Sequence, residues 1–447
     1  MAKTIARNAV VIGAGMGGLA SAKAIAPYFE HVTVLDRDIL PEKPAPRIGT
    51  PQARHAHALL ASGERALEAL FPGIGRDFVK GDAAPLRVGR DVIWERPGYD
   101  PFPRRDLGFD VISASRPMIE HVCRRRLQED PKVEIRSRAR VVDLVPSANH
   151  SAVAGVRYED AEGHVQDLPA GLVVDASGRA APTLSFLDRI GAPKPDETVI
   201  GIDVGYASAI VEPSKGDRDW LGVMHMGQPP DEGAGALILP IENGRWLVSL
   251  GRRPGGDMPA DIESLVAFSK NFRTPTIYEA LRTAKPLTQV ARYGFPASVR
   301  RHFDKLDLPS GLVPIGDSIC RFNPLFGQGI SVAALEAVAL GDLLGARAAS
   351  PDPLAGLGRD FVAQIQNLLD APWSVAVSDF AYPTTTGERP PDLAKRLLYS
   401  QAIVRLAAED ADVHKLMVEV AHLLKPPQAL REPPIRDRAI ALMTATA

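Results

Sequence analysis

Two glycine-rich segments, far apart in the chain, have the residue types and spacing that could bind a nucleotide. The first, residues 13–18, reads G-A-G-M-G-G and follows an apolar run at 9–12. In such a turn the first glycine, Gly13, allows a tight bend, and the second, Gly15, lets a pyrophosphate approach the backbone. The third, Gly18, lets the following helix pack closely on the strand, and the first N–H groups of that helix attract phosphate. The segment therefore predicts a dinucleotide site.

An acidic residue in the expected place supports this prediction. The β-branched run at 32–35 ends at Asp36. A carboxylate at the end of the second strand accepts hydrogen bonds from ribose hydroxyls. We therefore expect Asp36 and its neighbour Arg37 to contact the nucleotide.

The second segment could hold the other end of a longer cofactor. Gly316 and Asp317 follow a short apolar run at 312–315, and a carboxylate at a strand end can bind ribityl hydroxyls. A long helix rich in Ala, Leu and Val is then predicted to about residue 347. Glycines at its start leave backbone N–H groups free to stabilise an anionic reduced flavin ring. The residues expected to do so are Gly327, Gln328, Gly329 and Ile330.

The chain that follows Asp36 favours FAD over NAD. An NAD-dependent dehydrogenase continues its fingerprint as an unbroken Rossmann half, whereas prolines interrupt this sequence at positions 41, 44, 46 and 51. No second G-x-G-x-x-G is present, so the sequence predicts no stable NAD(P) domain.

Three further blocks carry a resemblance to a known family. Residues 172–179 read L-V-V-D-A-S-G-R, and residues 115–117 read S-R-P. With the glycine motifs, these blocks resemble the FAD-dependent monooxygenases of the aromatic hydroxylase and squalene epoxidase type. Residues 51–60, P-Q-A-R-H-A-H-A-L-L, are similar to a narrower branch that includes bacterial polyether-pathway epoxidases of the lasalocid and monensin type. The resemblance runs from about residue 6 to the region of residue 383.

The resemblance implies roles for individual residues. Further cofactor contacts are expected from Gln52, His55, Arg116 and Asp175. Pro324 and Phe326 lie where family members place residues that line the oxygen-reacting face of the flavin. Trp246 and Phe295 are weaker candidates for the substrate pocket.

The resemblance also implies an activity. Such enzymes bind FAD non-covalently and insert one oxygen atom of O2 into a hydrophobic small molecule through a flavin C4a-hydroperoxide. We expect epoxidation of an alkene, or hydroxylation, in secondary metabolism. The electrons would come from NAD(P)H, either directly or through a separate flavin reductase.

The same scaffold serves other functions. An FAD-dependent reductase or dehydrogenase of the geranylgeranyl reductase type is one alternative, and a flavin-binding protein without turnover is another. A flavin-dependent halogenase is disfavoured because the sequence has no W-x-W-x-I-P stretch.

These motifs require an α/β fold with a discontinuous Rossmann-like FAD-binding domain. We assign this domain residues 1–75, 108–190 and 301–350. Residues 76–107 and 191–300 would form a substrate domain around an antiparallel sheet, in which Asn243-Gly244 between two apolar runs is typical of a hairpin turn. Residues 351–447 would form a C-terminal helical region.

Composition narrows the remaining choices. The chain has 447 residues, 45% of them hydrophobic, and a formal net charge of −2, which favours neither nucleic acid nor an anionic membrane as partner. Two cysteines cannot form a disulfide framework, so we expect a reducing cytoplasmic location. No apolar run approaches the ~18 residues of a membrane span. No metal-ligand motif is found, so no metal is expected.

Overall fold

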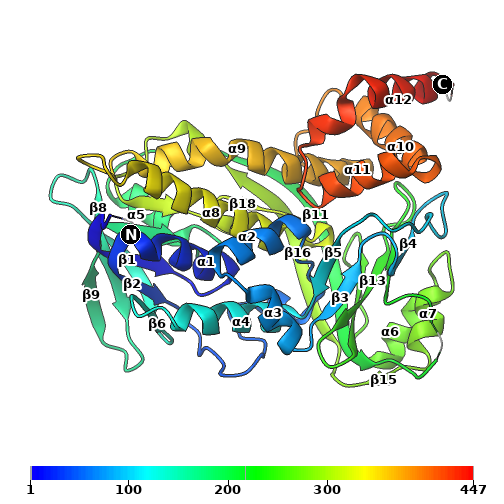
Figure 1. Ribbon diagram of the computed structural model, residues 1–447, viewed down its shortest axis with the longest axis horizontal. Helices are drawn as coiled ribbons and strands as arrows, with labels where there is room; N and C mark the ends of the chain where they lie inside the picture. The colour runs from blue at the N-terminus through cyan, green and yellow to red at the C-terminus, as the bar shows by residue number, and fades with distance from the viewer. Residues whose placement is uncertain (1–2, 217, 446–447) are drawn as a thin grey trace.

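A computed structural model describes residues 3–216 and 218–445. A five-stranded parallel sheet and a larger, mainly antiparallel sheet lie side by side, and the C-terminal helices cover one end of the larger sheet (Figure 1). The mixed α/β class and the C-terminal helical region predicted from the sequence are confirmed. The exact domain boundaries stay a prediction.

The parallel sheet holds the first glycine motif. Its strands, in order across the sheet, are β17 (Leu312–Pro314), β10 (Leu172–Asp175), β1 (Ala6–Ile12), β2 (Phe29–Leu35) and β6 (Val133–Arg136). Both faces of β1 are buried, since Ala9 and Val11 pack on one side and Val10 and Ile12 on the other. Apolar runs without alternation are typical of such two-sided burial. The carboxyl ends of β1, β2, β10 and β17 meet at one edge.

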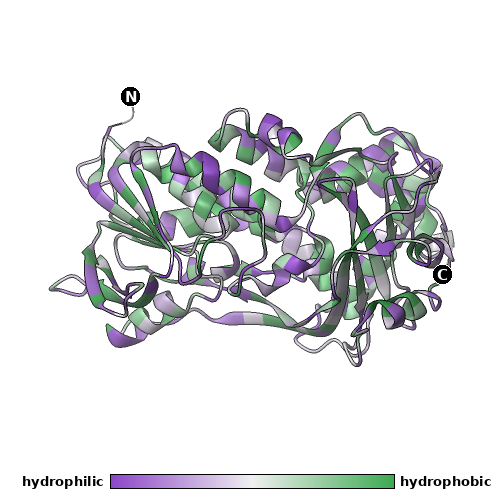
Figure 2. Ribbon diagram, turned by 90° about the horizontal axis from the view of Figure 1, so that it is seen from below, coloured by the Kyte–Doolittle hydropathy of each residue, from purple (hydrophilic) through white to green (hydrophobic). Residues whose placement is uncertain are grey.

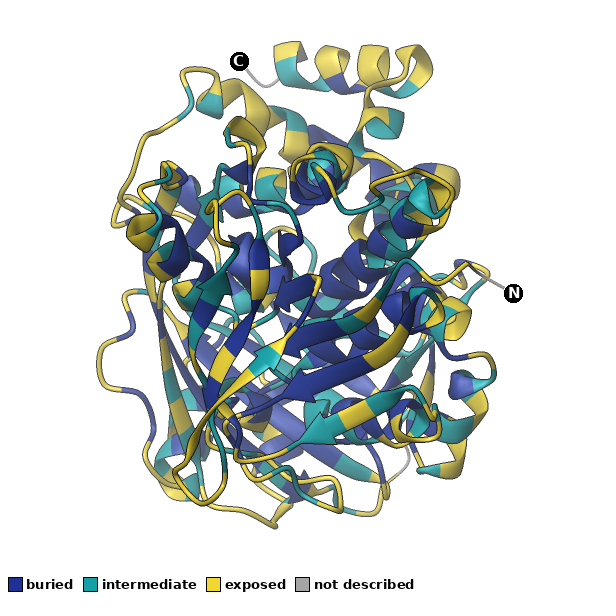
Figure 3. Ribbon diagram, turned by 90° about the vertical axis from the view of Figure 1, so that its left-hand side faces the viewer, coloured by how far each residue is buried: buried dark blue, intermediate teal, exposed yellow. Residues whose placement is uncertain are grey.

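Helices cover one face of this sheet, and a small antiparallel sheet covers the other. The helical layer consists of α1 (Met16–Ile25), α2 (Ala61–Leu70), α3 (Ile74–Lys80), α4 (Arg116–Gln128), α8 (Gly329–Arg347) and α9 (Leu357–Ala376). The opposite layer consists of β7 (Arg140–Pro146), β8 (Val153–Glu159), β9 (Val165–Pro169) and α5 (Ala181–Arg189). Figure 3 shows the resulting interior as a band of buried residues, with exposed residues at the loops and outer helices.

The larger sheet forms the second half of the molecule. Its strands are β18 (Cys320–Arg321), β16 (Ala291–Arg301), β11 (Glu197–Glu212), β14 (Arg245–Arg252), β13 (Gly235–Ile241), β12 (Gly222–His225) and β4 (Val92–Glu95), with β15 (Lys285–Pro286) beside β11. Asn243 and Gly244 both have φ of 63°, as a type I′ turn requires, so the predicted hairpin is confirmed. The helices α6 (Ile262–Ser269) and α7 (Thr276–Leu281) pack on its outer face.

The remaining elements are a short strand pair, the C-terminal helices and several single-turn helices. The short strands β3 (Ala84–Arg87) and β5 (Asp110–Ser113) pair with each other, and α10 (Leu393–Glu409), α11 (Ala411–Ala421) and α12 (Pro433–Ala445) form the C-terminal region. The single-turn helices are η1 (Ala26–Tyr28), η2 (Pro51–Arg54), η3 (Phe303–Lys305), η4 (Gly316–Ser318), η5 (Pro324–Phe326), η6 (Val377–Ala381) and η7 (Pro427–Arg431). Hydrophobic residues follow the inner strands and helices, while hydrophilic residues dominate the outer loops (Figure 2).

One helix bears on the prediction that the chain has no transmembrane segment. Among the described residues, α8 is long and apolar enough to cross a bilayer by length and composition alone. It packs against α1, α2 and α9, and 56% of its apolar window is buried in the protein. Its hydropathy is therefore explained by its position in the core.

Candidate functional site

In the first glycine motif, backbone segments approach each other so closely that two of the glycines have no room for a side chain. Gly13 has φ of +98°, and a β-carbon there would lie 2.8 Å from the carbonyl oxygen of Ala176. A β-carbon on Gly18 would overlap the carbonyl oxygen of Gly13. Gly15 differs, because its φ of −76° suits any residue and no backbone atom lies close to its side-chain position. Gly13 and Gly18 are thus required by the protein itself, whereas Gly15 leaves space for a ligand.

Two arginines border that space. A β-carbon on Gly15 would lie 3.8 Å from Nη2 of Arg116 and 3.9 Å from Nη2 of Arg47. Gly15 is also the N-cap of α1, and no side chain caps that helix start. Two guanidinium groups and a helix N-terminus therefore converge on one point, which suits a pyrophosphate.

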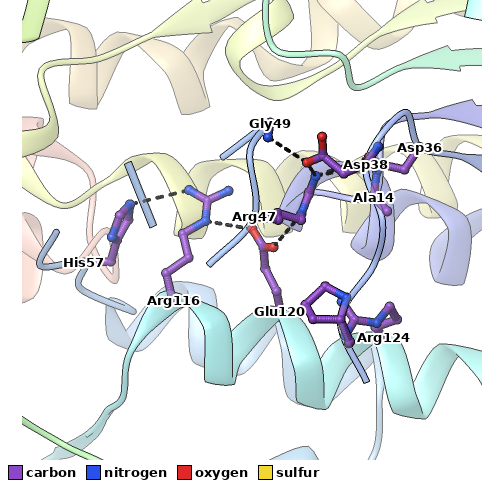
Figure 4. Close-up of polar contacts among 10 residues, drawn as sticks. Ala14, Asp36, Asp38, Arg47, Gly49, His57, Arg116, Glu120 and Arg124 are labelled. Atoms are coloured by element: carbon purple, nitrogen blue, oxygen red, sulfur yellow. Dashed lines mark hydrogen bonds and ion pairs between the residues drawn. The ribbon is translucent and has the colours of Figure 1, made fainter. Parts of the chain in front are cut away.

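A chain of polar contacts fixes the two arginines (Figure 4). Arg116 donates from Nε to Glu120 at 2.8 Å, and Arg47 donates to Asp38 at 2.7 Å and contacts the other oxygen of Glu120 at 3.4 Å. Glu120 thus bridges both guanidinium groups from α4. The Nη1 atom of Arg116 lies 3.5 Å from Nε2 of His57.

Asp36 is buried at the end of β2. It accepts hydrogen bonds from the backbone N–H of Ala14 at 2.6 Å and of Asp38 at 2.9 Å, and it contacts Arg47 at 3.2 Å. It therefore ties the glycine turn to the following loop. Arg37 is exposed, and its contact with the nucleotide stays a prediction. The sequence interpretation missed Arg47, whose segment it treated only as a run of chain-breaking prolines.

The second glycine motif lies beside the first. The carboxylate of Asp317 lies 3.9 Å from the side-chain position of Gly329, at the start of α8. Burial raises the pKa of Asp317, while the positive charges of Arg116, Arg321 and Arg301 oppose that rise. No hydrogen bond to this carboxylate is found within the described ranges, so it is free to accept one from a ligand hydroxyl.

The start of α8 has features that suit a bound ligand. Gly327 has φ of +65°, and a β-carbon there would lie 2.9 Å from that of Ala58. Gln328 is the N-cap of α8, and its buried Oε1 atom has no hydrogen-bond partner among the described residues. The helix continues through Gly329 and the buried Ile330. The tertiary fold therefore places both ends of the predicted cofactor site on the same edge of the parallel sheet.

A buried glutamate supports this edge and was not predicted. Glu336 of α8 accepts a hydrogen bond from the backbone N–H of Gly316 at 2.6 Å. Burial, with a contribution from the charge of Asp317, raises the pKa of Glu336 to about 8. The only signal for this contact in the sequence is one glutamate within an otherwise apolar helix.

Asp175 lies at the end of β10, and its contact with the cofactor stays a prediction. Its carboxylate is fully buried and accepts hydrogen bonds from Thr183 Oγ1 at 2.6 Å, from the Thr183 N–H at 3.2 Å and from the Ser177 N–H at 3.0 Å. These donors occupy both oxygens. Asp175 therefore holds the loop to the start of α5.

A cavity of about 750 Å³ opens between the larger sheet, η5 and α10. Pro324 and Phe326 line it, as do four residues of the block at 51–60, namely Gln52, His55, Ala56 and His57. Burial and the charge of Arg54 lower the pKa of His55 to about 4, and burial and Arg116 lower that of His57 to about 3. Both rings are neutral at pH 7.

Hydrogen bonds connect this cavity to the larger sheet. Nδ1 of His55 lies 2.7 Å from the hydroxyl of Ser208, and Ser249 accepts the N–H of Ala56 at 2.9 Å. Asn323, just before η5, accepts from the hydroxyl of Tyr206 and donates to Asp379 at 3.1 Å. Asp379 is buried and also binds Arg253. These contacts fix the positions of Pro324 and Phe326, and the sequence interpretation did not foresee them.

The two aromatic candidates for the substrate pocket do not line this cavity. Trp246 stacks on Trp220 in the core beneath α6 and α7, because the period of two puts it on the outer face of β14. Ser249 and Gly251 of the other face line the cavity instead. Phe295 is buried under the guanidinium of Arg321, 5.1 Å from its ring centre. Neither residue therefore lines this cavity, and their place in a substrate pocket stays a prediction.

The fold is shared with flavin-dependent enzymes. A flavoprotein/dehydrogenase from Cytophaga hutchinsonii aligns over 99% of this chain and 100% of its own with a TM-score of 0.70 at 15% identity. The flavin-dependent brominase Bmp2 aligns over 99% and 100% with a TM-score of 0.68 at 14% identity. PqsL of Pseudomonas aeruginosa, described as a probable FAD-dependent monooxygenase, aligns over 83% and 96% with a TM-score of 0.59 at 19% identity. The chain thus shares its fold with these proteins.

Sequence similarity identifies a particular family within that architecture. The chain belongs to the family of Protein Rv3254 from Mycobacterium tuberculosis (strain ATCC 25618 / H37Rv). The two are 33% identical over 355 residues, which cover 76% of this chain and 73% of the relative. No family model matches the sequence.

Proposed function

We propose that this protein is an FAD-dependent monooxygenase that inserts one oxygen atom of O2 into a hydrophobic small molecule. The observation that carries the proposal is the convergence of Arg47 and Arg116 on the open space above Gly15. This convergence supports a bound pyrophosphate, and Asp317 beside the start of α8 supports a flavin end to the same ligand. These residues fit FAD, because no backbone atom lies close to the side-chain position of Gly15 and no described residue donates a hydrogen bond to the Asp317 carboxylate.

The residues that would hold FAD divide into two groups. Gly15, Arg47 and Arg116 would bind the pyrophosphate. Asp36, just after β2, would accept a hydrogen bond from a ribose hydroxyl. Asp317 would accept hydrogen bonds from the ribityl chain, and the first N–H groups of α8 would face the flavin ring. When bound, the flavin supplies the redox chemistry that activates O2.

The protein's own residues would shape the cavity and exclude water from it. Pro324 and Phe326 line the cavity and are held by the buried Asn323–Asp379–Arg253 contacts. His55 and His57 are neutral and enclosed. A cavity of this volume accommodates a drug-sized molecule. Oxygen insertion needs this exclusion of water more than it needs an acid or a base.

Epoxidation is the form of the reaction that we favour. The block at 51–60, whose similarity to polyether-pathway epoxidases suggested this chemistry, contributes four residues to the cavity wall. Electrons would come from NAD(P)H, directly or through a flavin reductase. The fold is also compatible with a reductase of the geranylgeranyl reductase type.

Labelled oxygen separates these functions. The purified protein is loaded with FAD, reduced under anaerobic conditions and mixed with ¹⁸O2 and a panel of terminal alkenes and phenols. Incorporation of one ¹⁸O atom into a product is the expected result. Flavin reoxidation without labelled product, together with reduction of the alkene by the reduced enzyme, would favour the reductase. A folded protein that binds no FAD would overturn the cofactor assignment.

A further inference from the structure

One arginine in the cavity wall differs from its neighbours. Arg96 follows β4 and lines the cavity, and it is partly buried. Across residues 3–216 and 218–445, no acceptor of a hydrogen bond or ion pair from its guanidinium is found. By contrast, Arg253 binds Asp379, and Arg405 lies 3.6 Å from Glu409 with half of its side chain exposed. Arg96 is thus a partly buried cation that lines the cavity and has no counter-charge among the described residues.

The position of Arg96 is nevertheless well defined. Its guanidinium lies 4.7 Å from the ring centre of Trp94 and 5.7 Å from that of Phe102. Stacking on aromatic faces stabilises a guanidinium while leaving its N–H edge free. The backbone of the same turn is closed by reciprocal hydrogen bonds between Arg96 and Tyr99. The group is held in place by contacts that do not use its donors.

An unpaired guanidinium in a partly buried position destabilises the protein unless a ligand supplies a negative charge. Burying an unpaired charge is unfavourable, and burial lowers the pKa of Arg96 only to about 10, so the group remains charged at neutral pH. Among the described residues, the one carboxylate that lines the cavity belongs to Asp379, and Arg253 already neutralises it. An anion that entered the cavity would meet no uncompensated negative charge and one uncompensated positive charge.

We infer that the cavity binds a substrate that carries a carboxylate, and that Arg96 holds this group. One free guanidinium balances one negative charge, which matches a carboxylate better than a phosphate monoester, whose charge is about −1.5 to −2. The planar fork of arginine also suits bidentate contact with a carboxylate. Pro324 and Phe326 line a different part of the wall, at η5, so the anchored acid would direct another part of the molecule toward the flavin.

This inference deepens the proposed function and rests on it only in calling the ligand a substrate. Binding is therefore measured without turnover. The FAD-loaded protein is titrated by calorimetry at pH 7.5 with three acids, decanoate, 2-naphthoate and 4-phenylbutyrate, and with the primary amide of each. We expect at least one acid to bind about 10-fold to 100-fold more tightly than its amide, the range for hydrogen bonds to charged groups.

Two variants assign that preference to a residue. Arg96→Met keeps an apolar side chain against Trp94 and should abolish the preference for the acid. Arg405→Met removes the exposed arginine of the same cavity and should preserve the preference. Arg96→Met should also melt at the same or a higher temperature, because it removes an unpaired, partly buried charge. Should it fail to fold, Arg96→Gln takes its place.

The following results would contradict a carboxylate site at Arg96. If the parent protein prefers none of the three acids over its amide, the inference is overturned. The same holds if the parent protein binds none of the acids and none of the amides. A preference that survives in Arg96→Met or Arg96→Gln, or disappears in Arg405→Met, also overturns it. If the acid preference depends on Arg96 but no labelled oxygen reaches any product, the carboxylate site stands and the monooxygenase proposal fails.

Discussion

The Nη2 atoms of Arg47 and Arg116 lie 3.9 and 3.8 Å from the point that a β-carbon on Gly15 would occupy. Arg47 comes from the loop after β2, and Arg116 is the first residue of α4. Glu120 contacts both guanidinium groups, which keeps two like charges close together. An anion bound at this point would be surrounded by positive charge on one side and by the start of α1 on the other.

Gly15 and Gly18 should respond to the same substitution in opposite ways. Gly15→Ala should fold normally, because the backbone has φ of −76° and the new methyl group meets no atom closer than 3.8 Å. It should weaken FAD binding at least about 10-fold by filling the phosphate space. Gly18→Ala should destabilise the fold, because its methyl group would overlap the carbonyl oxygen of Gly13. Melting temperatures of the apoproteins and calorimetric titration with FAD measure both effects, and tight FAD binding by Gly15→Ala would remove this glycine from the site.

Arg116→Met should weaken FAD binding about 10-fold to 100-fold, because a charge-assisted contact to phosphate is lost. Arg125→Met, in the exposed part of the same helix, is the matched control and should bind FAD like the parent. Fluorescence quenching of FAD measures the affinities at fixed salt concentration. Equal losses in both variants would mean that only the overall charge of the protein matters.

Asp317→Ala should leave a folded protein with weaker FAD binding. The carboxylate is the group expected to meet the ribityl hydroxyls, and no described residue depends on it for a hydrogen bond. Asp342→Ala, at an exposed position of α8, is the control. Retention of FAD in Asp317→Ala at the parental affinity would show that the ribityl contact is misplaced.

Glu336 should make the stability of the apoprotein depend on pH. Its pKa is about 8 in the folded protein and 4.5 in a model compound, so the folded state binds the proton more tightly. Its contribution to stability is therefore complete below about pH 4.5 and is lost as the pH rises through 8, by roughly 1.4 kcal/mol per pH unit within that window. Glu336→Gln keeps an oxygen acceptor for Gly316 and should remove this dependence. Chemical denaturation between pH 5 and 9 compares the two proteins, and parallel pH profiles would contradict the assignment.

The sequence determined the features that depend on a few neighbouring residues. Gly13 and Gly18 are required by a backbone angle and by one close approach, and both requirements lie within a single strand-turn-helix unit. The Asn243-Gly244 turn is equally local, since two positive φ angles specify it. The α/β class and the convergence of the two glycine motifs follow from such units, because parallel strands bring their carboxyl ends to one edge.

Only the tertiary structure decided which side chains face the site. It placed Arg47 rather than Arg37 beside Gly15, and it turned Asp175 toward Thr183. The period of two put Trp246, Val248 and Leu250 on one face of β14, as the sequence indicates, but it could not say which face meets the cavity. The role of Glu336 depends on Gly316, which lies outside its own helix. The proposed role of Arg96 depends on the absence of an acceptor among the described residues around the cavity. Long-range packing sets these relationships, and no local pattern of residue types encodes them.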